Sequence, residues 1–187
     1  MPGKNYDKLA LIAAEQHGLI AAADARQAGV DPHRLIDMAR RGTIERVARG
    51  LYRFPLLGSR PDLGQLAQAT MWADRRGALS HDTALDVHDL CDINPARIHI
   101  TIPTAYRLQK PVPPLYVLYQ RDLEPAERTL HEGIPIVTPK RAILDGLESG
   151  IRADLLRQAI DTARRHGQLR GGELNRVRRL LAKRGAS

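Results

Sequence analysis

Asp31, Pro32 and Gly42 restrict the fold of the N-terminal region more than any other feature of the chain. Aspartate is a favoured N-cap, proline suits the first position of a helix, and glycine commonly ends one. Together these residues predict a helix from about Pro32 to Arg41, and Gly42 is expected to stop it.

The predicted helix has an apolar side and a cationic side. The apolar residues that recur at helical spacing are Leu35, Met38 and Ala39. The polar residues that fall on the other side are His33, Arg34, Asp37, Arg40 and Arg41. We therefore expect one side of this helix to be buried and the other to face solvent.

A short hairpin rich in arginine is predicted directly after this helix. Residues 44–47 and 51–54 are β-prone, and they are separated by Ala48, Arg49 and Gly50, whose glycine can adopt a positive φ. Two further helices are predicted before it, at about residues 7–17 and 21–28. Three helices followed by a hairpin is the order of a winged helix-turn-helix, in which the third helix enters the major groove of DNA and the hairpin lies beside it.

The rest of the chain mixes helices and strands after a Gly, Ser and Pro-containing linker at residues 57–61. The expected helices are at about residues 63–74, 81–90, 139–147, 153–166 and 172–183, and the expected strands at 97–102, 115–119 and 134–137. The predicted fold class is therefore α+β, with a winged helix-turn-helix domain at residues 1–57 and a small α+β domain at residues 62–187.

The charge of the chain favours a polyanionic partner. The net charge is +8 and the pI is about 10.1, although basicity alone fits DNA, RNA, a membrane surface or an acidic protein. The basic excess lies at residues 1–60 and 140–187, on either side of an acidic middle. No apolar run approaches the roughly 20 residues that span a bilayer, so we expect a cytoplasmic protein with no membrane contact.

The arginines of the third helix and the hairpin are the candidate DNA ligands, because a guanidinium binds a guanine edge or a phosphate well. The alternative for each is a solvated cationic surface. Arg49 lies at the predicted hairpin tip, the part most able to enter a minor groove. The predicted DNA-binding residues are His33, Arg34, Arg40, Arg41, Arg46, Arg49 and Arg53.

Residues 80–92, SHDTALDVHDLCD, contain side chains of the types that ligate metals. His81 and His88 are nearly two helical turns apart, and no zinc-protease or clustered-cysteine spacing accompanies them. A metal-dependent nucleic-acid enzyme with His81 and Asp82 at its centre is therefore the minor alternative. We expect no catalytic residues, no metal and no cofactor, and we expect the histidines to have polar packing roles.

The C-terminal segment predicts an amphipathic basic helix. Its apolar stripe is Leu174, Val177, Leu180 and Leu181, and its basic residues are Arg176, Arg178, Arg179, Lys183 and Arg184. The basic side is open to three interpretations, which are contact with nucleic acid, contact with an acidic protein surface, or solvation alone.

The ordered set of motifs resembles the AbiEi family of antitoxins and transcriptional regulators. The matching stretches are GLIAAADARQAGVDPHRLIDMARRGTIERVARGLYR, ALSHDTALDVHDL, HITIPTAYR, RDLEPAERTLHEGIPIVTPKRAILD and QAIDTARRHGQL, which cover most of the chain. The resemblance implies a winged helix that binds operator DNA and represses its own operon, and a C-terminal domain that counters an AbiEii nucleotidyltransferase toxin. We expect a monomer or weak dimer. Whether the toxin is contacted directly stays open, as does a single-component repressor without a toxin.

Overall fold

The computed structural model describes residues 3–57 and 60–184, so that Gly58 and Ser59 of the expected linker lie outside the described residues. The chain divides into two compact units, residues 1–75 and 76–187. Helix α4 (Pro61–Trp72) therefore belongs to the first unit, although the sequence suggested that it opens the second. Long-range polar contacts explain the difference, since Arg53 of the hairpin donates to Gln68 of α4 at 2.7 Å.

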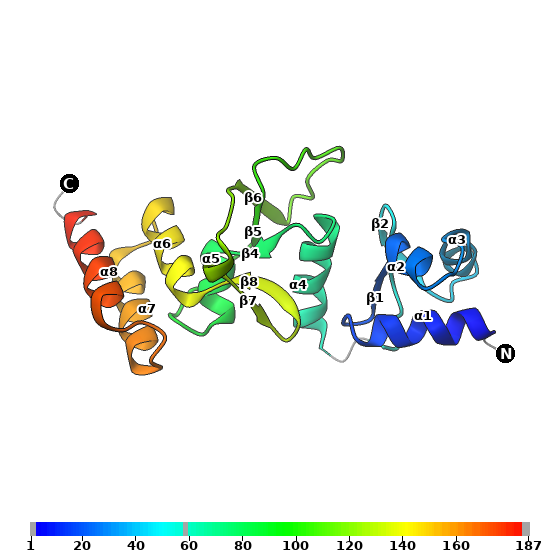
Figure 1. Cartoon of the computed structure of the whole chain (residues 1–187), viewed down its shortest axis with the longest axis horizontal. Coiled ribbons are helices and arrows are strands. Elements are labelled where there is room, and N and C mark those ends of the chain that lie inside the picture. Colours follow the sequence, from blue (N-terminus) through cyan, green and yellow to red (C-terminus); the bar gives the residue numbers. More distant parts are fainter. Residues whose placement is uncertain (1–2, 58–59, 185–187) are drawn as a thin grey trace. The chain divides into compact units, whose positions relative to one another are not determined.

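The described part of unit 1 contains four helices and a small antiparallel sheet in the order β1-β3-β2 (Figure 1). The elements before α4 are α1 (Lys4–Ala14), β1 (Leu19–Ala21), α2 (Ala22–Gln27), α3 (His33–Arg40), β2 (Glu45–Ala48) and β3 (Leu51–Arg53). The predicted helices and hairpin are thus present. Strand β1 was not predicted, because three residues are too few to show an alternating pattern; it forms by pairing Ile20 with Tyr52.

The core of unit 1 gathers apolar side chains from α1, α2 and α3 and from the hairpin. Its buried members are Leu9, Ala13, Ile20, Ala25, Val30, Leu35, Ile44, Tyr52 and Phe54. Leu35 is fully buried, and Met38 and Ala39 pack against the cluster, which confirms the predicted inner face of the third helix. Tyr52 of β3 is buried in the same core, so it packs the hairpin against the helices.

Unit 2 is built on a five-stranded mixed sheet in the order β6-β5-β4-β8-β7. The strands are β4 (Ala78–Leu79), β5 (Ile98–Ile102), β6 (Tyr116–Gln120), β7 (Arg128–His131) and β8 (Ile134–Val137). The pairs β5–β6 and β4–β8 are parallel and the other neighbours are antiparallel. Strands β4 and β7 were not predicted, and both owe their geometry to pairing with neighbouring strands rather than to an alternating sequence.

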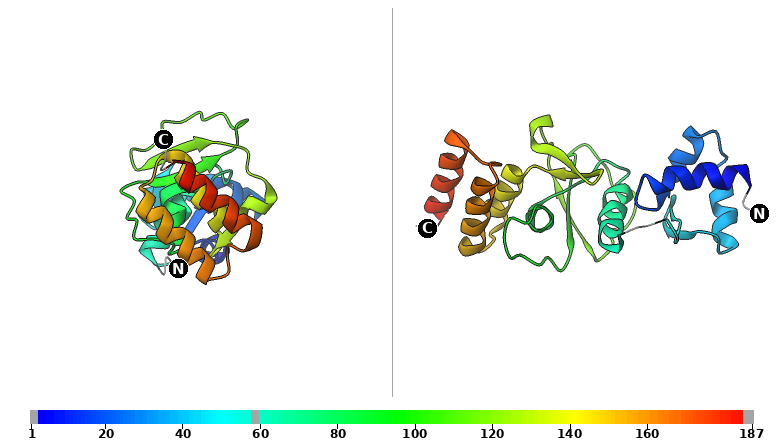
Figure 2. Two further views of the ribbon diagram at one scale, coloured as in Figure 1. Left: turned by 90° about the vertical axis from the view of Figure 1, so that its left-hand side faces the viewer. Right: turned by 90° about the horizontal axis from the view of Figure 1, so that it is seen from below.

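The helices of unit 2 form successive layers beside the sheet (Figures 1 and 2). They are α5 (His81–Val87), α6 (Pro139–Ser149), α7 (Ala153–Arg165) and α8 (Gly171–Arg184), with a short 3-10 turn at Pro125–Glu127. Helix α5 packs on β5 and α6, α7 packs on α6, and α8 packs on α7. Gly146 allows the close approach beside α7, because a Cβ there would lie 3.0 Å from Leu156 Cδ2.

The apolar stripe of α8 is only partly buried. Val177 and Leu181 are buried, whereas Leu180 is 40% exposed. Among all helices of the described residues, none has the length and apolar character needed to cross a membrane.

Candidate nucleic-acid interface

Helix α3 begins with the side-chain cap that the sequence predicted. The Asp31 carboxylate accepts a hydrogen bond from the His33 backbone N–H at 2.9 Å and lies 3.1 Å from the ring Nδ1 of the same residue. The bond from the His33 backbone holds the pKa of Asp31 below its usual value. The cap satisfies an N–H group that the helix itself leaves without a partner, and it fixes where the helix starts.

The outer side of α3 is exposed at both ends of the helix, and Asp37 in its middle is half-buried. His33, Arg34, Arg40 and the following Arg41 are all exposed, while Leu35 on the inner side is fully buried. The helix therefore presents its cationic side to solvent because its apolar side is held in the core.

The hairpin carries arginine at its tip. Ala48 pairs with Leu51, so that Arg49 and Gly50 form the turn, and Gly50 has a φ of +72°. The Gly50 carbonyl accepts a hydrogen bond from the Ala22 N–H at 2.8 Å, which ties the hairpin to the start of α2. Arg46 lies on β2 next to a register shift, and it is exposed.

Five arginines of this surface have guanidinium groups with no protein partner. Within the described part of unit 1, the side chains of Arg34, Arg40, Arg41, Arg46 and Arg49 make no hydrogen bond or ion pair. We call these five side chains and His33 the basic face. Exposed and unpaired guanidinium groups can bind phosphates without first breaking an internal ion pair.

Arg53 differs from the other predicted ligands. It lies on the central strand β3, is half-buried, and donates to Gln68 of α4. Arg75 makes a comparable link, since its guanidinium lies 2.6 Å from the buried carboxylate of Asp24 on α2. Both arginines join parts of unit 1 to one another, so we leave Arg53 out of the basic face.

The residues of the enzymatic alternative are not assembled as a metal site. His81 is buried and stacks on Tyr119 with ring centroids 3.4 Å apart, and its Nδ1 lies 2.9 Å from Ser80 Oγ. Burial lowers the pKa of His81 to about 3. The Asp82 carboxylate lies near His99 instead, with Asp82 Oδ1 3.8 Å from His99 Nδ1. Across residues 3–57 and 60–184, no three His, Cys, Asp or Glu side chains are grouped so that they could hold a metal ion.

His88 also has a polar packing role. Its Nε2 lies 2.8 Å from the carbonyl oxygen of Val137 at the end of β8. Burial lowers the pKa of His88 as well. Both predicted packing histidines are therefore used to join α5 and its C-terminal turn to neighbouring elements.

Sequence reasoning missed a buried ionic cluster that joins α6 to the sheet and to the turn before β7. Its members are Arg121, Glu127, Arg141, Asp145 and Glu148. Arg141 is central, with its Nε 2.9 Å from Asp145 Oδ1. Burial raises the pKa of Asp145 to about 6, and its Oδ2 has no hydrogen-bond partner among the described residues. Because both guanidinium groups are paired with carboxylates of this chain, the cluster holds the domain together.

The three helices, the β1-β3-β2 sheet and the exposed hairpin define unit 1 as a winged helix-turn-helix domain. Residues 7–55 match the model of the family described as "Transcriptional regulator, AbiEi antitoxin". Residues 7–55 are thus similar to the AbiEi antitoxin transcriptional regulators, as the motifs of this region predicted, and the match covers about a quarter of the chain. The matched residues include all of the basic face and end before α4.

A solved structure extends the likeness in fold to both units. The crystal structure of the RV2827C protein from Mycobacterium tuberculosis is similar to 95% of this chain, over 72% of its own length, with a TM-score of 0.57 and 18% sequence identity. An identity this low shows a shared fold alone. No curated protein matches the chain.

Proposed function

We propose that this protein is an antitoxin that binds operator DNA through its winged helix, represses its own operon in the cytoplasm, and counters a nucleotidyltransferase toxin through its C-terminal domain. It does so without catalysis or a cofactor. The observation that carries the DNA-binding role is the basic face, where five unpaired guanidinium groups lie within the region that matches a transcriptional-regulator family.

The two parts of the basic face have different tasks in this proposal. Arg34, Arg40 and Arg41 enter the major groove with α3, where guanidinium groups read base edges and hold phosphates. Arg49 reaches the neighbouring minor groove or its phosphates from the hairpin tip. Phosphate neutralisation supplies much of the affinity, so binding weakens steeply as salt rises.

Replacement of Arg49 by alanine tests the hairpin assignment. The Arg49→Ala variant should bind the DNA upstream of its own gene about fivefold more weakly, because one phosphate or groove contact contributes roughly 1 kcal/mol. Fluorescence anisotropy at several salt concentrations should also show a slope of log K against log salt that is smaller by about 1.

The matched control is Lys8→Ala, which removes one exposed positive charge from α1 of the same unit. It should leave both the affinity and the salt slope near those of the unmodified protein. If Arg49→Ala behaves like this control while its melting curve is unchanged, the hairpin does not contact DNA. Restored growth when the chain is co-expressed with a nucleotidyltransferase toxin tests the antitoxin role separately.

A further inference from the structure

Helix α3 has one acidic residue, Asp37, and it lies on the outer side of the helix. Leu35 is fully buried in the core, and Asp37 follows it by two residues, which is roughly 200° around the helix. Asp37 also comes four residues after His33 and three before Arg40, so these three side chains lie along one line. Because His33 and Arg40 are exposed, Asp37 lies in the middle of the surface that the basic face presents.

The Asp37 carboxylate has no partner although arginines lie close to it in the sequence. Arg34, Arg40 and Arg41 are three or four residues away, the spacing at which opposite charges pair on a helix. Across the residues that the structure describes, the side chain of Asp37 nevertheless makes no hydrogen bond or ion pair. The carboxylate is therefore not used to hold the arginines of the basic face in place.

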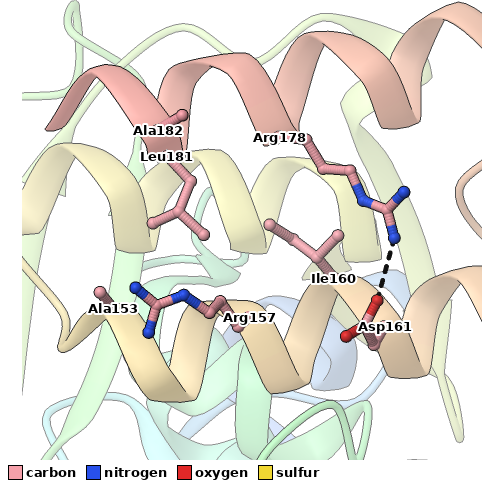
Figure 3. A pocket seen from close by; sticks show the side chains of 7 residues that line it. All are labelled: Ala153, Arg157, Ile160, Asp161, Arg178, Leu181 and Ala182. Carbon is pink, nitrogen blue, oxygen red and sulfur yellow. Dashed lines mark hydrogen bonds and ion pairs between the residues drawn. The ribbon is translucent and has the colours of Figure 1, made fainter. Parts of the chain in front are cut away.

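Other aspartates at the surface of this chain do pair with nearby arginines. In the groove between α7 and α8, Arg178 donates to Asp161 at 3.1 Å (Figure 3). Near the start of α4, Arg60 donates to Asp62 at 2.9 Å. The side chains of both pairs are at least half exposed. Exposure to water alone therefore does not explain why the carboxylate on α3 is left free.

The stability of α3 does not explain an aspartate at position 37 either. Aspartate is a poor helix former inside a helix, because its side chain competes for backbone hydrogen bonds. Position 37 belongs to the last turn of α3, where the helix dipole disfavours a negative charge. Asp31, by contrast, caps the start of the same helix and stabilises it. The two aspartates therefore differ in role, and Asp37 is placed for contact with the bound DNA.

The chemistry of the base edges decides what a carboxylate can bind on a recognition helix. Phosphates repel it, so it has to face a base that donates a hydrogen bond. In the major groove, guanine presents two acceptors, and thymine presents an acceptor and a methyl group. Adenine presents a donor beside an acceptor, which would repel the second carboxylate oxygen. Cytosine presents its N4 amino group as a donor without an acceptor beside it, so an aspartate selects cytosine.

We infer that Asp37 accepts a hydrogen bond from the N4 amino group of a cytosine in the operator and thereby determines part of its sequence. This inference rests on the DNA-binding role proposed above. Where another base takes the place of that cytosine, the carboxylate meets acceptors and phosphates without a donor, which weakens binding to other DNA. The arginines of the basic face thus supply affinity, and Asp37 restricts the sequences to which they bind.

Selection from a library of random DNA duplexes, with sequencing of the bound fraction, tests this inference on the full-length chain. The unmodified chain should enrich a motif that contains a fixed cytosine. Asp37→Asn should change the preference at that position to adenine, because an asparagine amide pairs with N6 and N7 of adenine. For Asp37→Ala, replacing that C·G pair by T·A should raise Kd by only about twofold, against about tenfold for the unmodified chain.

The matched control is Asp7→Asn, which removes one exposed negative charge from α1 of the same unit and should leave the selected motif unchanged. A partly unfolded variant does not imitate the expected result, because base preference is a ratio of two affinities of the same protein.

The outcomes separate this inference from the proposed function. If both Asp37 variants select the same motif as the unmodified chain, Asp37 reads no base, and the inference is overturned while the DNA-binding role stands. A gain in affinity that is equal for all sequences would show only a general repulsion between Asp37 and DNA, and it would overturn the inference as well. If the unmodified chain enriches no sequence at all, both the inference and specific operator binding are wrong.

Discussion

Replacing Arg141 by alanine should destabilise unit 2 by roughly 3–5 kcal/mol, which is the cost of removing one partner of a buried ion pair. The Arg141 side chain is 9% exposed, and Asp145 is 1% exposed. The other partners of Arg141 are Glu148 and Glu127, which are 51% and 29% exposed and therefore better solvated. Most of the loss thus comes from the Asp145 carboxylate, which stays buried.

A second arginine beside Asp145 limits the loss of stability in the Arg141→Ala variant. Arg121 Nη1 lies 3.5 Å from Asp145 Oδ1 and remains in the variant, so we expect a destabilisation near the lower end of the 3–5 kcal/mol range, about 3 kcal/mol. At roughly 4 °C of melting temperature per kcal/mol for a unit of this size, unit 2 should melt about 12 °C earlier at pH 8.

The destabilisation caused by Arg141→Ala should depend on pH, and it should be larger at high pH than at low pH. Burial already raises the folded-state pKa of Asp145 to about 6, above the ordinary aspartate pKa of 3.8. A raised folded-state pKa means that this carboxyl contributes stability at low pH which is lost as the pH rises through that value. Loss of Arg141 raises the pKa further, so the destabilisation should be large at pH 8 and clearly smaller at pH 5, where Asp145 is protonated.

Chemical denaturation at pH 5 and pH 8 measures the loss in free energy of unfolding caused by Arg141→Ala at each pH. The Arg152→Ala variant is the matched control, because Arg152 pairs with Asp154 on the surface, where the side chains are 77% and 54% exposed. It should cost less than about 1 kcal/mol at either pH. In an Asp145→Asn background, the Arg141→Ala change should lose its pH dependence. An equal cost at pH 5 and pH 8 in the native background would refute the reasoning, since lost packing alone does not titrate over this range.

Three further variants test how unit 1 is built. Gly50→Ala should destabilise unit 1 by about 1–2 kcal/mol in a thermal melt, because φ at Gly50 is +72° while the added Cβ meets Ala22 Cβ at an ordinary 3.8 Å. Gly64→Ala on α4 should have the opposite sign, about 0.5–1 kcal/mol more stable, since its new Cβ meets nothing within 4 Å; a gain at both positions would argue against backbone strain at the hairpin tip. Leu35→Ala should cost about 2–5 kcal/mol through the cavity it leaves, and operator binding should fall only as the unfolded fraction of unit 1 rises.

The helix and hairpin of the basic face were predictable because their signals are local. The Asp31 side chain caps a helix through a backbone group two residues away, and Gly50 permits a turn between strands that follow one another in the chain. The apolar spacing around Leu35 likewise shows which side of α3 faces inward. The candidate DNA ligands were chosen from these signals. The hydrogen bond from Arg53 to Gln68 of α4 could not be predicted in this way, because the two residues are distant in the sequence.

Tertiary structure decided the features that depend on distant partners. Strands β1, β4 and β7 are too short to show periodicity, and they exist because neighbouring strands offer them hydrogen bonds. The Gly, Ser and Pro-containing linker at residues 57–61 does not show that α4 belongs to unit 1, because the contacts of α4 with that unit come from residues distant in the sequence.

The sequence by itself determined the winged helix, the cationic side of α3 and the two basic regions, because capping, glycine conformation and helical periodicity act over a few residues. Only the folded chain brought Arg121, Arg141 and Asp145 together in a buried cluster and set α8 against α7 to form a groove. Burial gives these contacts their energy, and burial depends on residues that the local sequence does not contain.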